Sequence, residues 1–162
     1  MIRIVNLTSD VTGAAYYGLL DFAAARSSEF YVIDQFGIAE VGRPPFVTLD
    51  PFLFVQENVV EWPGTRLLDV DSRTALKSRY TVTPQSIDAL KRVASGLYAW
   101  SAHAEIPLPE DLGFLRANGS LVLGTTTHEY DAWLELLKEE LGVFESFAKR
   151  VGLRYSLQRV ET

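Results

Sequence analysis

The chain has 162 residues, of which 48% are hydrophobic and 22% are charged, a balance typical of one globular domain. It contains no cysteine, which excludes disulfides, cysteine nucleophiles and cysteine-ligated zinc or iron–sulfur centres. The first residues lack the pattern of a signal peptide, and no apolar run is long enough to span a bilayer. We therefore expect a single domain over residues 1–162, located in the cytoplasm.

The first half of the chain predicts two strands, one helix and an irregular segment. Alternating apolar residues predict a short strand over 2–7, and a second strand is expected over 30–33. Between them, Ser9 and Asp10 can cap a helix that continues to about Arg26. The segment 42–65, GRPPFVTLDPFLFVQENVVEWPGT, contains four prolines and predicts extended chain with turns.

The middle of the chain carries strong local signals. Residues 66–82 predict two strands joined by a turn at Asp71-Ser72. Thr83 followed by Pro84 predicts the start of a helix, whose apolar stripe continues to about Trp100. Asn118-Gly119 lies between two apolar runs, which predicts a hairpin turn with positive φ at both central positions.

The C-terminal part predicts a short strand or turn to about Leu134, followed by a helix that ends at Gly152. Loose alternation over 154–160 predicts an edge strand. Mixed short strands and about three helices indicate an α+β domain, in which the helices pack on a mostly antiparallel sheet.

The net charge of −6 is concentrated in one segment. Residues 110–145 hold eight acidic residues against two basic ones, and the rest of the chain is balanced. Nucleic-acid binding needs a basic stripe, so a nucleic-acid ligand is not expected for this segment. Two interpretations remain open, a basic protein partner or a solvated acidic face.

His128 and Glu129 are the first candidates for a catalytic site. A zinc metalloprotease motif would need a second histidine at position 132, where the chain has Ala132. His103 could instead join His128 and a carboxylate from Glu105, Asp111 or Glu129 in a two-histidine, one-carboxylate site. The alternative is that His128 closes a strand end and its ring bonds a threonine or a carbonyl.

Other catalytic patterns are weaker. Thr125, Thr126, Thr127 or Ser101 could serve as a nucleophile with a histidine base, but the G-x-S-x-G motif is absent. Phosphate-binding glycine loops are also absent, so no nucleotide or other cofactor is expected. Glu110 and Asp111 are adjacent, so on a strand they would face opposite sides; after Pro109 we expect them to shape a turn.

Phe52, Phe54 and Trp62 lie in the proline-rich segment, where regular burial is hard to arrange. Aromatic residues on an irregular surface are frequent anchors of protein interfaces. The alternative is a loop that folds down onto the sheet and buries these side chains.

Three stretches carry a resemblance: NVVEWPGT at 58–65, LYAWSAHAEIPLPEDLGFL at 97–115 and GSLVLGTTTHEYDAWLEL at 119–136. Together they resemble a loosely defined group of small bacterial proteins with the pattern W-P-G-T, L-Y-x-W, L-P-E-D-L-x-F-x-R and a strand ending in H-E. The resemblance implies no enzymatic activity. In size, solubility and acidity the group is similar to bacterial immunity proteins, which neutralise a toxin by binding it.

The expected function is thus a non-enzymatic module that binds a protein partner, such as a basic toxin, without a metal or cofactor. The expected partner-binding residues are Glu110, Asp111, Glu129, Asp131, Glu135, Trp62, Phe52 and Phe54. The alternative is a small hydrolase or metal-dependent enzyme centred on His128 and Glu129, with His103 as a further ligand.

Overall fold

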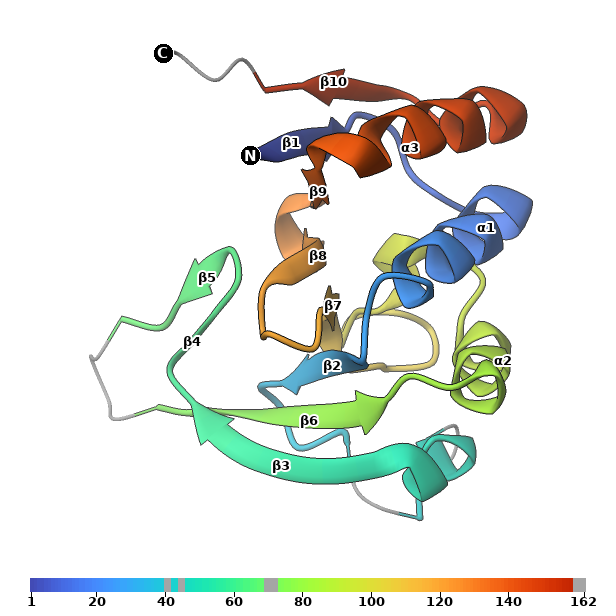
Figure 1. Ribbon diagram of the computed structural model, residues 1–162. Coiled ribbons are helices and arrows are strands. Elements are labelled where there is room, and N and C mark those ends of the chain that lie inside the picture. Colours follow the sequence, from blue (N-terminus) through green and yellow to red (C-terminus); the bar gives the residue numbers. More distant parts are fainter. Residues whose placement is uncertain (40–41, 44–45, 69–72, 159–162) are drawn as a thin grey trace.

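An eight-stranded antiparallel sheet dominates the computed structural model, which describes residues 1–39, 42–43, 46–68 and 73–158 (Figure 1). The strand order is β10-β1-β9-β8-β7-β2-β6-β3, and a separate hairpin is formed by β4 and β5. The strands are β1 Ile2–Leu7, β2 Glu29–Asp34, β3 Leu53–Val59, β4 Glu61–Trp62, β5 Thr65–Arg66, β6 Ala75–Thr81, β7 Glu110–Leu115, β8 Leu121–Thr126, β9 Asp131–Leu137 and β10 Tyr155–Leu157. The predicted α+β class is confirmed.

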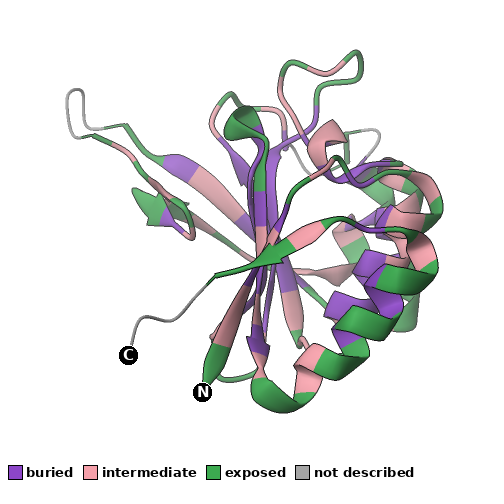
Figure 2. Cartoon of the chain, turned by 90° about the horizontal axis from the view of Figure 1, so that it is seen from above, coloured by how far each residue is buried: buried purple, intermediate pink, exposed green. Residues whose placement is uncertain are grey.

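Three helices cover one face of this sheet, as Figure 2 shows from above. They are α1 Gly13–Ala24, α2 Pro84–Val93 and α3 Lys138–Val151. The opposite face, called the open face below, carries the β4–β5 hairpin. Short 3-10 helices add turns at Phe46–Thr48, Asp50–Phe52, Leu97–Ala99 and Thr127–Glu129. None of the helices in the described part of the chain is long and apolar enough to cross a membrane.

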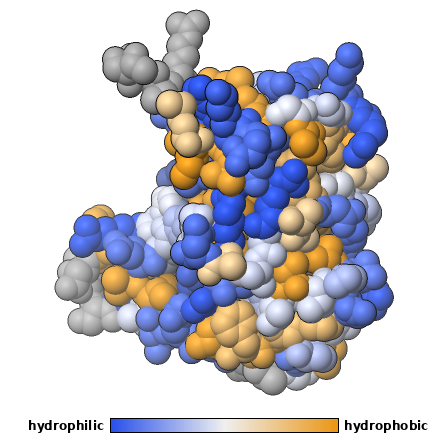
Figure 3. All heavy atoms as spheres, viewed as in Figure 1, coloured by the Kyte–Doolittle hydropathy of each residue, from blue (hydrophilic) through white to orange (hydrophobic). Residues whose placement is uncertain are grey.

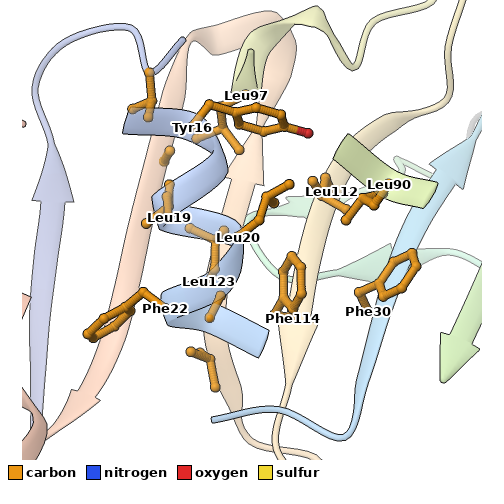
Figure 4. Packing of buried hydrophobic residues seen from close by; sticks show 14 of the residues in the cluster. Tyr16, Leu19, Leu20, Phe22, Phe30, Leu90, Leu97, Leu112, Phe114 and Leu123 are labelled. Carbon is orange, nitrogen blue, oxygen red and sulfur yellow. The ribbon is translucent and has the colours of Figure 1, made fainter. Parts of the chain in front are cut away.

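The main core lies between the helices and the sheet. Phe30 and Phe114 point from neighbouring strands toward Leu20 of α1 and Leu90 of α2, and all four side chains are buried (Figure 4). Because the middle of the sheet is covered on both faces, β2 is buried from Phe30 through Asp34 and does not alternate between buried and exposed residues.

Two helix boundaries differ from the sequence prediction. Helix α1 begins at Gly13, because the Asp10 carboxylate accepts a hydrogen bond from the Val11 N–H at 2.8 Å and shapes a turn before the helix. Helix α2 begins as predicted, with Thr83 and Ser86 forming a reciprocal capping box. It ends at Val93, well before Trp100, because the chain becomes extended and Gly96 pairs with Thr12.

The hairpin at Asn118-Gly119 is confirmed, but its geometry is different. The Gly119 N–H donates to the Arg116 carbonyl at 2.8 Å, and the Arg116 N–H donates to the Ser120 carbonyl at 2.8 Å. Within the loop, Gly119 has a φ of 82°, whereas Asn118 does not have a positive φ. This is a three-residue loop that ends in a left-handed glycine, and it replaces the expected two-residue turn.

The C-terminal elements follow the prediction with a shifted boundary. Strand β9 continues to Leu137, so α3 starts three residues later than expected. The helix ends as predicted at Gly152, which has a left-handed φ of 69°. Edge strand β10 then pairs with β1. The predicted turn at Asp71-Ser72 and the proline pair at 44–45 lie outside the described residues.

Candidate functional site

One end of the sheet is strongly acidic. There β2 ends against the start of β7, β8 ends against the start of β9, and the residues after β1 contact the segment after α2. We define the acidic end as residues 8–12, 34–39, 95–111 and 126–131, at the end of the sheet away from the N-terminus in Figure 2. It has no lysine or arginine and seven acidic residues, namely Asp10, Asp34, Glu105, Glu110, Asp111, Glu129 and Asp131.

A β-bulge at Asp111 organises this end. In the pairing of β2 with β7, Tyr31 faces Gly113 and Ile33 faces Glu110, so two residues of β7 occupy the space opposite Val32. Asp111 has a left-handed φ of 56°, which is uncommon for a residue other than glycine. Because the bulge breaks the alternation of the strand, Glu110 and Asp111 do not face opposite sides. Both residues lie in strand β7, so the prediction that they shape a turn after Pro109 is wrong.

The Asp111 carboxylate connects three distant parts of the sequence. Its Oδ2 accepts a hydrogen bond from Trp62 Nε1–H at 2.7 Å, and its Oδ1 accepts one from the Thr127 N–H at 2.8 Å. In return, the Asp111 N–H donates to Thr127 Oγ1 at 3.1 Å. Asp111 is fully buried, so these bonds replace the water that it has lost. The W-P-G-T, P-E-D and T-H-E stretches thus meet at one side chain.

The β4–β5 hairpin is held against the open face by close packing as well. Gly64 has a φ of 85°, and a Cβ atom there would lie 2.5 Å from Thr126 Oγ1 and 2.7 Å from the Trp133 ring. The Trp133 ring also lies over Gly124. Around this contact a second cluster forms from Tyr31, Ile33, Trp62, Ala75, Leu115 and Leu121. Trp62 is therefore buried, and it is not available as a surface anchor.

Glu110 and His128 lie beside Asp111. One ligand atom from each of these three residues lies within 4.8 Å of the other two. Glu110 is only 4% exposed, and its Oε2 accepts one long hydrogen bond from Gln35 Nε2 at 3.3 Å. His128 is half-exposed, and its Nε2 lies 3.8 Å from Glu129 Oε1. Within the described part of the chain, its ring makes none of the expected hydrogen bonds to a threonine or a carbonyl.

The other predicted catalytic residues are placed differently. His103 is exposed and its ring contacts Phe36, with centroids 5.9 Å apart. Among the described residues, the only group of three possible metal ligands is Glu110, Asp111 and His128, so the structure does not bring the two histidines into one such group. Thr125 Oγ1 is buried and donates to the Leu112 carbonyl at 2.9 Å. This hydroxyl therefore stabilises the pairing of β7 with β8 and is not free to act as a nucleophile.

The predicted partner-binding residues divide into three groups. Glu110, Asp111 and Trp62 are buried, whereas Glu129 and Asp131 are exposed at the acidic end. Glu135 is half-buried on β9. Phe52 and Phe54 lie near the start of β3, at the opposite end of the sheet; Phe52 packs partly against the main core, and Phe54 is half-exposed. Figure 3 shows apolar residues gathered over this β3 edge.

The acidic end also displays apolar side chains that the sequence analysis did not single out. Phe36, Ile106 and Tyr130 are 56%, 65% and 74% exposed. The Tyr130 ring packs edge-on against Tyr98, with centroids 5.4 Å apart. Burial raises the pKa of Tyr98 to about 12, and the nearby charges of Asp131 and Asp10 add to the shift. The Tyr98 ring therefore lies close to the negative charges of Asp131 and Asp10.

Comparisons with known proteins gave no match, whether with protein-family models, with curated proteins or with solved structures.

Proposed function

We propose that this protein is a binding module for a basic protein partner, and that it acts as an immunity-type protein by covering its target. The observation that carries the proposal is the acidic end, where exposed apolar side chains lie among four exposed acidic residues, Asp10, Glu105, Glu129 and Asp131, without a lysine or arginine. Apolar anchors surrounded by charge are the usual composition of a specific protein interface.

The two kinds of side chain have separate roles in this proposal. Glu105, Glu129 and Asp131 are exposed, and their charges would steer a basic partner and increase the association rate. Phe36 and Tyr130 would be covered on binding and would slow dissociation. A toxin that acts on nucleic acid needs a basic substrate site, and the acidic end has the charge to cover such a site.

The alternative function, a small hydrolase or metal-dependent enzyme centred on His128 and Glu129, has less support than the binding module. The Thr125 hydroxyl is buried and bonded, and the Thr127 hydroxyl accepts the Asp111 N–H, so neither is poised beside a histidine base.

The proposal is tested with the proteins encoded by the neighbouring genes, each purified and measured for binding to the full chain. We expect one of them to bind with an association rate that falls steeply with salt. Reversing two charges, Glu129→Lys with Asp131→Lys, should lower that rate about tenfold at low salt. Tyr130→Ala should instead raise the dissociation rate about tenfold. Loss of binding should also remove the protection of cells that express the partner.

Matched controls lie away from the acidic end. Glu145→Lys reverses one acidic charge on α3, and Phe54→Ala removes a ring that is 50% exposed near the start of β3. Neither control should alter the association or dissociation rate. The proposal is wrong if no neighbouring product binds, or if Phe54→Ala abolishes binding while the acidic-end variants leave it intact.

A further inference from the structure

Glu110, Asp111 and His128 form a group with the composition of a metal site. Two carboxylates and one imidazole place a ligand atom each within 4.8 Å of the others. Three protein ligands with a further position left open for water or another molecule are typical of reactive zinc sites. The bulge at Asp111 creates this arrangement, because it turns two consecutive carboxylates of β7 toward the same histidine.

A second observation points to a bound cation. The Glu110 side chain is only 4% exposed, and the hydrogen bond that its Oε2 accepts from Gln35 Nε2 is long, at 3.3 Å. No described lysine or arginine forms a salt bridge with Glu110 or Asp111, although both are buried. Two buried negative charges without a counter-charge are strongly destabilising, and a cation between them would remove this cost.

The surrounding side chains fit the same role. Trp62 Nε1–H and the Thr127 N–H fix the Asp111 carboxylate, as outer-shell hydrogen bonds do for metal-binding carboxylates. His128 is half-exposed on the Thr127–Glu129 turn, so its ring can rotate toward the carboxylates and close the group. Tetrahedral zinc ligands lie about 3.4 Å apart, so only a small closure is required. The exposed histidine also leaves a path for the ion to enter.

We propose that Glu110, Asp111 and His128 bind a divalent transition-metal cation of the Zn²⁺ or Mn²⁺ type. The imidazole favours these ions over Ca²⁺ and Mg²⁺, which prefer ligand sets made of oxygen. Trp62 is a positioning residue, since it acts on the ion through Asp111. The ion would neutralise the buried carboxylates and tie the turn after β8 to the start of β7. This proposal is independent of the partner-binding proposal, because the site belongs to the chain alone.

The test is calorimetric titration of the full chain, freed of metal with a chelator, with ZnCl₂, MnCl₂, MgCl₂ and CaCl₂ in turn. We expect one Zn²⁺ or Mn²⁺ per chain and a higher melting temperature in its presence. Glu110→Gln and His128→Ala should each raise the dissociation constant at least tenfold. Trp62→Phe should raise it about 10- to 100-fold while every ligand remains. His103→Ala, which removes the other exposed histidine, should change nothing.

Glu110→Gln also distinguishes a lost ligand from a misfolded chain. It removes one of two repelling charges, so it should raise the melting temperature of the metal-free protein while it weakens metal binding. The proposal is overturned if Zn²⁺ and Mn²⁺ do not bind the wild-type chain, or if only Mg²⁺ or Ca²⁺ binds. It is equally overturned if His128→Ala abolishes binding while Glu110→Gln leaves it unchanged, since the ion would then sit on a surface histidine. If added metal has no effect while Glu110→Gln is stabilising, the two carboxylates are not bridged by an ion and the metal site does not exist.

Discussion

The two faces of the sheet are stabilised in different ways. On the helix-covered face, large apolar side chains such as Phe30, Phe114 and Leu20 fill the space between the layers. On the open face, a short hairpin approaches Thr126 and Trp133 closely at Gly64, and one indole–carboxylate hydrogen bond fixes it. The first face depends mainly on buried area, whereas the second depends on close approach and on a single polar group.

This difference locates the candidate site. A face that is stabilised by buried apolar surface area tolerates many apolar side chains of similar total volume. A face that is stabilised by a bulged aspartate and close glycine contacts specifies a few positions sharply. The polar side chains that remain near Asp111, namely Glu110 and His128, are those with unused bonding capacity. The two faces should therefore respond differently to substitution.

The largest effect is expected on the helix-covered face. Phe114→Ala removes a fully buried ring that contacts Phe30 at a centroid distance of 5.7 Å. The lost burial and the cavity should lower the free energy of unfolding by about 3–5 kcal/mol, measured by urea denaturation. Val143→Ala, on the exposed side of α3, should change it by less than about 0.5 kcal/mol. Equal effects of the two substitutions would contradict the packing described here.

The next effect concerns the hydrogen bond between Trp62 and Asp111. Trp62→Phe keeps an aromatic ring but removes the N–H that donates to Asp111 Oδ2 at 2.7 Å. We expect a loss of about 2–3 kcal/mol in the free energy of unfolding, because a buried carboxylate oxygen loses its donor.

A double-mutant cycle separates this bond from the loss of ring volume. Asparagine also tolerates the left-handed backbone, so Asp111→Asn is the suitable partner substitution. In that background Trp62→Phe should cost about 1 kcal/mol or less. An unchanged cost would show that the ring, and not the bond, holds the hairpin.

The smallest effect tests the glycine under Tyr31. In Gly113→Ala the new Cβ atom would lie 2.3 Å from the Tyr31 hydroxyl. The resulting shift should lower the free energy of unfolding by about 1–2 kcal/mol, after allowance for the usual gain from replacing glycine. In contrast, Gly142→Ala on α3 meets nothing within 4 Å and should raise it by about 1 kcal/mol. Two changes of the same sign would argue against the close approach on the open face.

The helix-covered face could largely be predicted from the sequence, because its signals are local. Thr83-Pro84 and Gly152 each define a helix boundary through their own backbone preferences. The early end of α2 could not be predicted, since the apolar stripe continues to Trp100. That indole is buried and donates to the Tyr16 hydroxyl at 2.9 Å, although the residue is not helical.

The site could be predicted only in part. The sequence allows His128 and Asp111 to meet in one site, but the addition of Glu110 depends on a bulge that places an aspartate in a left-handed conformation. The burial of Trp62 depends on a partner 49 residues away. Gly113 and Gly124 carried a usable signal, because a glycine inside a strand often marks the close approach of another group.

The place of β1 in the sheet has a consequence for how the chain is made. This strand pairs with β9 on one side and with β10 on the other, so both of its neighbours come from the last part of the sequence. During synthesis at ordinary rates, β1 must wait on the order of ten seconds before either partner exists. Strand β1 precedes the strands that it pairs with by more than 120 residues and is therefore among the last of the described strands to be paired, and a truncation that removes β9 and the residues after it leaves β1 without either of these neighbours.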